Sequence, residues 1–205
     1  SNTLNRNQLI NNVSNDLQEK FGLAEDQFRI TGLAVLYNNM LQSLFDSEIK
    51  SLGIVFGVIL LMFLVIFRSI KVAVIGLIPN ILTASSVLGL LGILSIPLDI
   101  MTITVAAISV GMAVDNTIHY LYRYKVEISN GVAPSDAILK SHTTIGRAIL
   151  YTALTISIGF LIFSFSNFSP TVLFGTFTSL AIFTSLVATL ILLPLLLQSF
   201  KAFDS

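Results

Sequence analysis

The chain has 205 residues, no net formal charge, 54% hydrophobic residues and only 11% charged residues. Soluble domains carry about 25% charged residues, so this composition and the mean hydropathy of +0.87 exclude a water-coated globule and indicate that much of the surface faces lipid. The charged residues are segregated along the chain, and nothing in their distribution resembles a basic nucleic-acid-binding face. The absence of cysteine excludes disulfides, thiol catalysis and cysteine-ligated metals.

Residues 1–48 are polar and are predicted to form a small α+β segment. Apolar residues recur at a spacing of four through 7–21, which indicates an amphipathic helix that ends at Gly22. Alternation over 28–31 predicts a short strand, and a helical pattern resumes at Leu33. The segment is too small to bury a core of its own, so we interpret it as the end of a larger domain.

Five long apolar runs follow within residues 49–200. Each is long enough for the roughly 20 residues that a membrane-spanning helix needs. The predicted fold class is therefore mainly α, a polytopic transmembrane bundle of five spans. The joint before the fourth span is predicted to contain a short interfacial helix that begins near Pro134. The predicted spans are residues 51–67, 72–94, 100–122, 147–166 and 172–197.

The basic residues lie at alternate joints between these runs. The two short joints on the other side carry none, and positive charge is retained in the cytoplasm. This pattern predicts a multi-pass protein of the cell (inner or plasma) membrane with an extracytoplasmic N-terminal segment and a cytoplasmic C-terminus. Because no signal sequence precedes the polar start, we expect an earlier transmembrane helix and interpret the chain as a C-terminal fragment. The basic residues are Arg68, Lys71, Arg123, Lys125, Lys140, Arg147 and Lys201.

Asp115, in the third span, is the candidate for a chemical role. A charged side chain at membrane depth costs about 2.5–3.5 kcal/mol on insertion scales, and a carboxyl that changes charge with water access suits a proton-coupled machine. Gly111 and His119 lie four residues to either side, on the same helix face. Gly111 would let a neighbouring helix approach, and His119 could pass or stabilise a proton. The alternatives are a packing hydrogen bond for Asp115 and simple solvation for His119.

For the other polar residues in the spans, the sequence gives weaker evidence of a functional role. Thr152 and Thr155, in the fourth span, could be partners of the Asp115 carboxyl, or their hydroxyls could bond their own backbone. Pro79 removes a donor and is predicted to kink the second span, where Asn80 could satisfy the freed carbonyl. The tyrosines at 120, 122 and 124 are predicted to form an interfacial belt. No pattern indicates a metal site, a cofactor site or an enzyme.

The stretch from Gly111 to Tyr124 resembles the fourth helix of a half-repeat in resistance-nodulation-division exporters, and within them the MMPL-type branch of hydrophobe and lipid exporters. The resemblance implies two similar halves, each with one helix, a large outside domain and five further helices. Residues 1–48 would then be the C-terminal remnant of a porter-like domain. The five-helix unit is also similar to a sterol-sensing domain. Further matching pieces are Phe67-Arg68-Ser69, Ile78-Pro79-Asn80, Gly146-Arg147-Ala148-Ile149 and Pro194.

This resemblance implies export of a hydrophobic or lipid-like substrate, driven by the proton-motive force, with Asp115 as the relay acid. Many relatives have tyrosine where this chain has Asn116, so the relay would be arranged differently here. The implied partners are membrane lipids, the N-terminal half of the same transporter and a hydrophobic or amphiphilic substrate, and a homo-oligomer is left open. Nucleic acid is not an implied partner.

Three other interpretations remain. The chain could be a lipid- or sterol-sensing regulatory module that does not pump. It could be an accessory membrane subunit of protein translocation, a family that shares the Gly-Met-Ala-Val-Asp string ending at Asp115, although there the acid is usually followed by Ala-Asn-Val. It could also be a half that serves only as a scaffold for the other.

Overall fold

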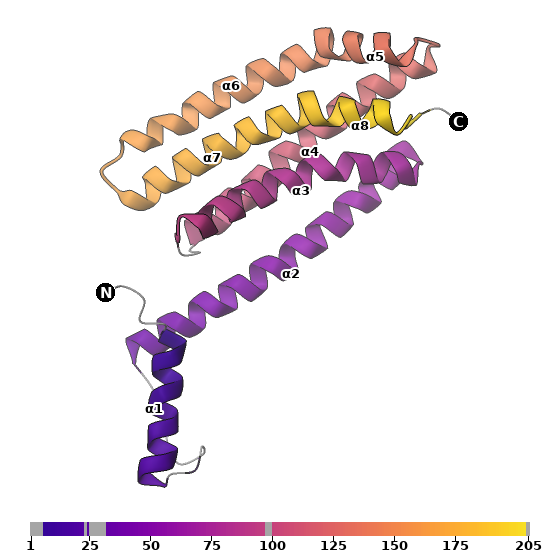
Figure 1. Cartoon of the computed structure of the whole chain (residues 1–205). Helices are drawn as coiled ribbons and strands as arrows, with labels where there is room; N and C mark the ends of the chain where they lie inside the picture. The colour runs from indigo at the N-terminus through magenta and orange to yellow at the C-terminus, as the bar shows by residue number, and fades with distance from the viewer. Residues whose placement is uncertain (1–5, 23, 25–31, 97–99, 204–205) are drawn as a thin grey trace. The chain divides into compact units, whose positions relative to one another are not determined.

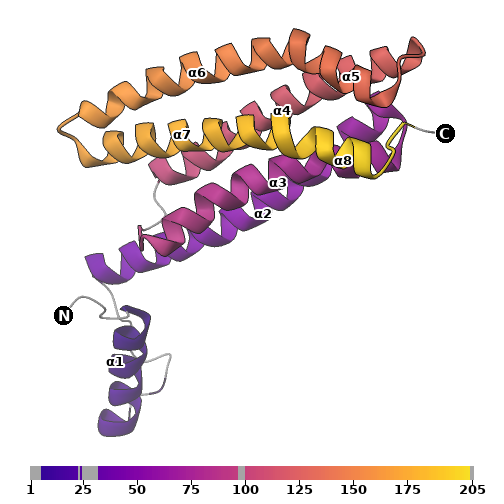
Figure 2. The same cartoon turned by 45° about the horizontal axis from the view of Figure 1, so that its top comes forward.

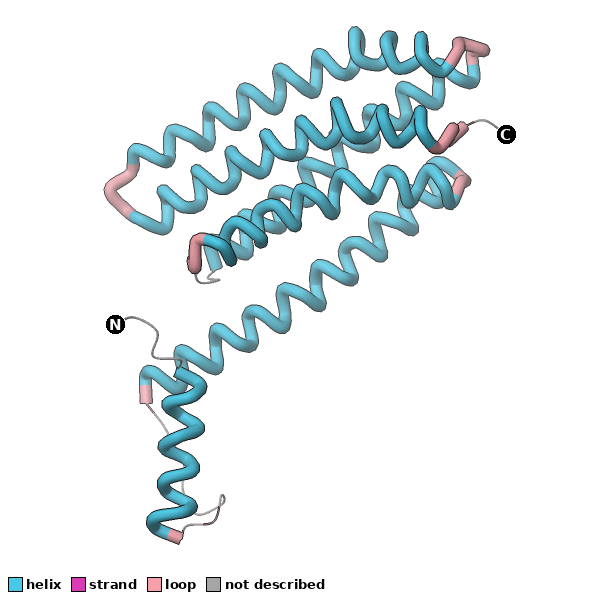
Figure 3. Tube along the Cα trace, in the orientation of Figure 1, coloured by secondary structure: helices cyan, strands magenta, loops and turns pink. Residues whose placement is uncertain are grey.

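The structure is a computed structural model that describes residues 6–22, 24, 32–96 and 100–203. The described residues are helical and contain no strand (Figure 3). The strand predicted at 28–31 lies outside the described residues. The elements are α1 (Arg6–Phe21), α2 (Leu33–Phe67), α3 (Ile70–Ile93), α4 (Ile100–Ser129), α5 (Pro134–Ser141), η1 (His142–Gly146), α6 (Arg147–Leu161), η2 (Ile162–Phe165), α7 (Ser169–Val187), η3 (Ala188–Leu192) and α8 (Leu193–Ser199).

The chain divides into two compact units, Ser1–Lys50 and Ser51–Ser205. In the first unit, α1 matches the predicted amphipathic helix. It ends at Gly22, whose φ of +65° is a conformation that glycine adopts without steric cost. Among the described residues, five helical stretches are long and apolar enough to cross a membrane, which confirms the predicted transmembrane bundle. They are Ile49–Phe67, Ile70–Ile93, Met101–Ser129, Pro134–Phe165 and Ser169–Ser199.

All five stretches are longer than their sequence patterns indicated, the third and the fourth by the most residues. The third was expected to end at residue 122 but continues to Ser129, because its last turns are polar yet remain helical. The fourth was expected to begin at residue 147. It begins instead at Pro134, because the predicted interfacial helix α5 runs without a break through η1 into α6. Hydropathy marks where a helix leaves hydrocarbon, whereas the helix itself ends only where its hydrogen bonds end.

Helix α7 is the centre of the second unit. It packs against α3, α4 and α6, and Figures 1 and 2 both show it running beside α6 and continuing into α8. Half of the most apolar window of its span is buried, against 11% in the first and fourth spans. Those two spans therefore present most of their apolar surface outward, as helices in contact with lipid do.

Local signals in the sequence set the ends of α3. At its start, the Ser69 hydroxyl accepts a hydrogen bond from the Val72 N–H at 3.4 Å, which is a normal N-cap. At its end, Ser95 has a φ of +54°. Its N–H donates to Gly92 O, and the Ile96 N–H donates to Leu91 O. These two bonds form a Schellman motif, which turns the chain toward α4 in few residues.

Candidate functional site

The side chains of Asp115 and His119 contact each other on the outside of α4. The distance from Asp115 Oδ1 to His119 Nε2 is 3.3 Å, and the two residues are one helical turn apart. Their side chains are 71% and 58% exposed in the isolated chain. The acid therefore points away from the helices of its own bundle, with His119 as its polar neighbour.

The helix face that carries this pair also carries small residues, and no other described helix of this chain covers it. Ala107 and Gly111 precede Asp115 at intervals of four residues and are exposed. A Cβ atom built on Gly111 would meet nothing within 4 Å, so the predicted close helix approach at Gly111 is not made by any described part of this chain. We call Ala107, Gly111, Asp115 and His119 the outer face of α4.

Asn116 points to the opposite side of α4, toward α7. Its side-chain amide donates to the Ser185 hydroxyl at 3.5 Å, and Ser185 is buried. Thr117, the next residue, is fully buried as well. Successive helical residues are about 100° apart around the axis, so Asp115 faces outward while Asn116 packs inside. The structure does not bring the two side chains together.

Thr152 and Thr155 also lie apart from Asp115. Both are exposed on α6, and α7 packs against both α4 and α6. The Thr155 hydroxyl donates to the Tyr151 carbonyl at 2.8 Å, which is the backbone-bonding alternative. Neither threonine has a hydrogen bond to Asp115 among the interactions of the described residues.

Pro79 and Asn80 lie in the buried interior of α3, which continues through them. Pro79 has no N–H for the Ile75 carbonyl four residues earlier. The Asn80 side-chain amide donates to Gly76 O at 2.7 Å, one residue beyond the carbonyl that Pro79 leaves free. The Thr83 hydroxyl donates to Pro79 O at 2.9 Å. Side chains thus bond the backbone on both sides of the proline.

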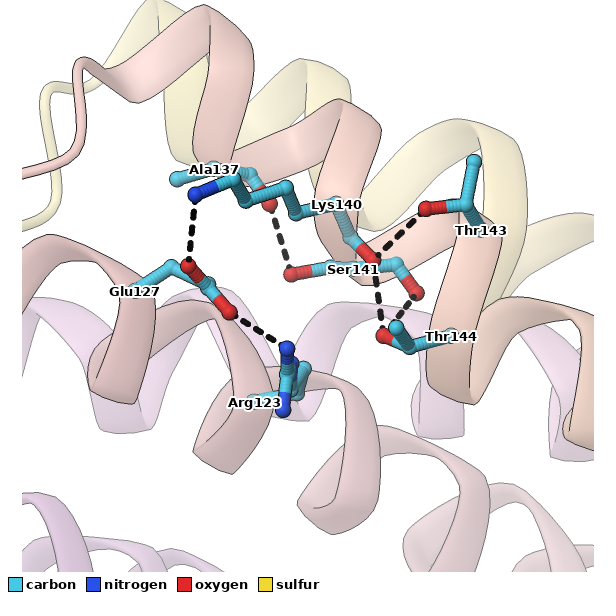
Figure 4. Close-up of polar contacts among 7 residues, drawn as sticks. All are labelled: Arg123, Glu127, Ala137, Lys140, Ser141, Thr143 and Thr144. Atoms are coloured by element: carbon cyan, nitrogen blue, oxygen red, sulfur yellow. Dashed lines mark hydrogen bonds and ion pairs between the residues drawn. The ribbon is translucent and has the colours of Figure 1, made fainter.

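The sequence interpretation missed a charged cluster at the junction of α4 and α5, drawn in Figure 4. Glu127 is 8% exposed and binds two bases: Arg123 Nη2 at 2.5 Å from Oε1, and Lys140 Nζ at 3.5 Å from Oε2. The four-residue spacing of Arg123 and Glu127 was a usable signal. The contact with Lys140 crosses a turn, and no local pattern could have predicted it.

The predicted interfacial belt requires exposed tyrosines, and two of its three members are buried. Tyr122 is 60% exposed, whereas Tyr120 and Tyr124 are buried. The Tyr120 ring meets His142 edge to face, with ring centroids 5.5 Å apart, and the Tyr124 ring packs against Phe203. The belt failed as a prediction because positions 120 and 124 lie on the inner side of α4, where other elements cover them.

Known membrane proteins are similar to this chain in sequence. The family model described as MMPL family matches residues 3–203. A protein of Methanocaldococcus jannaschii, named only as a membrane protein, is 29% identical over 139 residues, which is 68% of this chain and 36% of that protein. The transport protein MmpL11 of Mycobacterium leprae is 25% identical over 212 residues, which is 95% of this chain and 20% of that protein.

The chain thus spans well under half the length of both relatives. The match nevertheless covers all five spans and the outer face of α4. On this evidence of sequence and architecture, the chain belongs to the MMPL family.

Proposed function

We propose that this chain is the five-helix membrane part of one half of an exporter that is driven by the proton-motive force and moves hydrophobic or lipid-like substrates. The observation that carries the proposal is the Asp115–His119 pair on the outer face of α4. Membership of the MMPL family and the similarity to the transport protein MmpL11 support a transport function.

An uncovered carboxyl in a membrane span needs a partner other than lipid. Leaving it charged in hydrocarbon costs about 2.5–3.5 kcal/mol, and His119 is too exposed to shield it. Ala107 and Gly111 place no large side chain on the same face, and small residues let helices pack closely in membranes. These features support a second group of helices, from the N-terminal half of the same transporter, packed against the outer face of α4.

A carboxyl at such an interface can link proton movement to helix movement. In its neutral form it tolerates an apolar neighbour, and in its charged form it requires water, His119 or another polar partner. One charge that moves through 100 mV yields about 2.3 kcal/mol. That energy is sufficient to shift a balanced two-state equilibrium about fifty-fold, so each proton could drive one rearrangement of the halves.

The distribution of basic residues supports an orientation in the inner or plasma membrane. Lys71 Nζ lies 3.4 Å from Lys201 O, and Lys125 Nζ lies 3.3 Å from Ile66 O. The C-terminus, the α2–α3 turn and the α4–α5 turn thus meet at one end of the bundle (Figure 1). By the positive-inside rule this end is cytoplasmic, and the N-terminal segment, a remnant of a porter-like domain, is outside.

The test uses the full-length transporter reconstituted in liposomes with a pH-sensitive dye inside. An imposed proton gradient should decay faster with the wild-type protein than with Asp115→Asn, which keeps the shape of the side chain but cannot ionise. Asp136→Asn is the matched control, because Asp136 is an exposed carboxylate on α5, away from the outer face of α4. It should behave as wild type.

Equal proton flux through the wild-type and Asp115→Asn proteins would reject the proposal. Binding of a fluorescent phospholipid that survives both Asp115→Asn and collapse of the gradient, without any proton flux, would instead indicate a lipid-sensing module. Loss of flux in both Asp115→Asn and Asp136→Asn would point to damaged folding rather than to a relay.

A further inference from the structure

Two π-helical turns face each other at the cytoplasmic end of the bundle. They are η1, His142–Gly146, and η3, Ala188–Leu192. A Cβ atom built on Gly146 would lie 3.5 Å from Leu190 Cδ2, so the two turns are in close contact. Such turns make up well under 1% of residues in proteins, and they often occur at functional sites.

The sequence explains why the helix hydrogen bonds are disturbed at both places. Before η1, the Lys140 carbonyl accepts from the hydroxyls of both Thr143 and Thr144 (Figure 4), and such bonds from side chain to backbone bend helices. After η3, Pro194 has no N–H for the Leu190 carbonyl four residues earlier.

One side chain, His142, joins these two turns to α4. Its Nε2 lies 2.9 Å from Leu190 O, the carbonyl that Pro194 cannot serve. Its Nδ1 lies 2.7 Å from the hydroxyl of Tyr120, which is fully buried, and 3.1 Å from Ile138 O. The His142 ring is thus surrounded by two carbonyl oxygens and one hydroxyl.

The proton on Nδ1 decides which of these bonds can form. A carbonyl only accepts, so Nε2 needs a proton to donate to Leu190 O and Nδ1 needs a proton to donate to Ile138 O. The neutral ring has a single N–H and can donate to only one of these carbonyls. When that N–H is on Nε2, Nδ1 accepts a hydrogen bond from the Tyr120 hydroxyl. In the charged ring both nitrogens donate, so both carbonyls can be bonded at once, and Nδ1 no longer accepts from the Tyr120 hydroxyl. Charging also strengthens the bond to Leu190 O.

We propose that His142 is a proton-sensitive positioning residue: when neutral it can donate to only one of the two carbonyls that it faces, and when charged it donates to Ile138 O of α5 and Leu190 O of η3 at the same time. In the transport cycle it would set how firmly α5 and η3 are held together. The inference rests on the proposed function only for that role, because the hydrogen-bond exchange itself requires no transport.

Few other charges bear on His142. Tyr120 is the titratable group whose contact with the ring is recorded. Glu127 is already bound by Arg123 and Lys140, and the residues of η3 and α8 contain no ionisable side chain. The ionisable groups of the elements packed against η1 are Asp115, His119, Tyr120, Tyr122, Arg123, Tyr124, Lys125 and Glu127 from α4, Asp136 and Lys140 from α5, and Arg147 and Tyr151 from α6.

The test is hydrogen exchange of the backbone amides in η1 and η3, on the full-length protein in lipid nanodiscs between pH 5.5 and 8. Histidine changes charge in this range. The control is His142→Gln at each pH, whose side-chain amide can still donate to Leu190 O but cannot titrate. Relative to this variant, protection of the wild type should change across the range by about threefold, as expected for one hydrogen bond in a membrane protein.

Two further variants keep the test decisive if His142→Gln does not fold. Tyr120→Phe removes the hydroxyl that contacts Nδ1, so the pH dependence of protection should differ from that of the wild type. His119→Gln removes the other histidine of the chain and should leave the change as in wild type. A wild-type protection profile without pH dependence, or one unmoved by Tyr120→Phe, would overturn the inference.

The failure of this inference can be told apart from that of the proposed function. Asp115→Asn should abolish proton flux yet keep the pH-dependent exchange at η1 and η3. If hydrogen exchange at η1 and η3 depends on pH but the Asp115→Asn protein still conducts protons, the proposed exporter is rejected and the role of His142 stands. If proton flux depends on Asp115 but hydrogen exchange at η1 and η3 does not depend on pH, the role of His142 is rejected and the proposed exporter stands.

Discussion

Replacing Gly175 by alanine should force α7 away from the end of α6. A Cβ atom at Gly175 would lie 2.5 Å from Phe160 O and 2.5 Å from Phe163 Cβ. Carbon atoms normally pack at about 3.5–4.0 Å, so the helices must separate by roughly 1 Å. The obstacle includes backbone, which cannot rotate away as the end of a side chain can.

The magnitude follows from two opposing effects. Overpacking a close contact costs about 1–3 kcal/mol. Alanine offsets up to about 1 kcal/mol of this cost because its helix propensity is higher than that of glycine. When this full offset applies, Gly175→Ala should therefore destabilise the protein by up to about 2 kcal/mol and lower its Tm, measured by size-exclusion chromatography of heated, detergent-solubilised protein.

The matched control is Gly159→Ala on α6, where a Cβ atom would meet nothing within 4 Å. This variant should melt at or slightly above the wild-type temperature. Gly76→Ala should fall between the two, because its nearest neighbours, at 2.8 and 2.9 Å, are the ends of the Leu121 and Phe63 side chains. Equal Tm values for Gly175→Ala and Gly159→Ala would refute the packing argument.

Two further variants test the polar contacts of the bundle. Glu127→Gln removes the carboxylate that binds Arg123 and Lys140. It should cost about 1–2 kcal/mol, near the lower end for a buried pair because both bases are partly exposed, and should speed hydrogen exchange in α5. Ser179→Ala removes a hydroxyl that lies 2.5 Å from the Ser157 hydroxyl and should cost about 0.6 kcal/mol in SDS unfolding. A double-mutant cycle with Ser157→Ala that gives no coupling energy would contradict it.

The sequence predicted the membrane architecture well because hydropathy reports directly on the environment of each helix. Five spans were expected, and the part of the chain that the structure describes contains five helical stretches that could cross a membrane. The pattern was weaker at the helix ends, since the polar residues up to Ser129 extend α4 without contributing hydropathy. The same limit applies to η1, where the helix continues through residues that resemble a loop in composition.

The candidate site was predicted in part. Helical periodicity correctly placed Gly111, Asp115 and His119 on one face, because that relation depends only on residues per turn. It could not say whether the face is covered, because that depends on which helices are neighbours. Thr155 was grouped with Asp115 on chemistry alone, and the structure gives its hydroxyl a backbone partner. His142 and Leu190 are 48 residues apart, so only the fold brings them together.

The outward direction of Asp115 has a practical consequence for experiments. Because a Cβ atom at Gly111 would meet nothing within 4 Å and the side chains of Asp115 and His119 are mostly exposed, uncharged replacements there should leave the packing of the described helices unchanged. A substitution library at these three positions would therefore report on docking and ion coupling, free of the folding defects that usually obscure mutational scans of membrane spans.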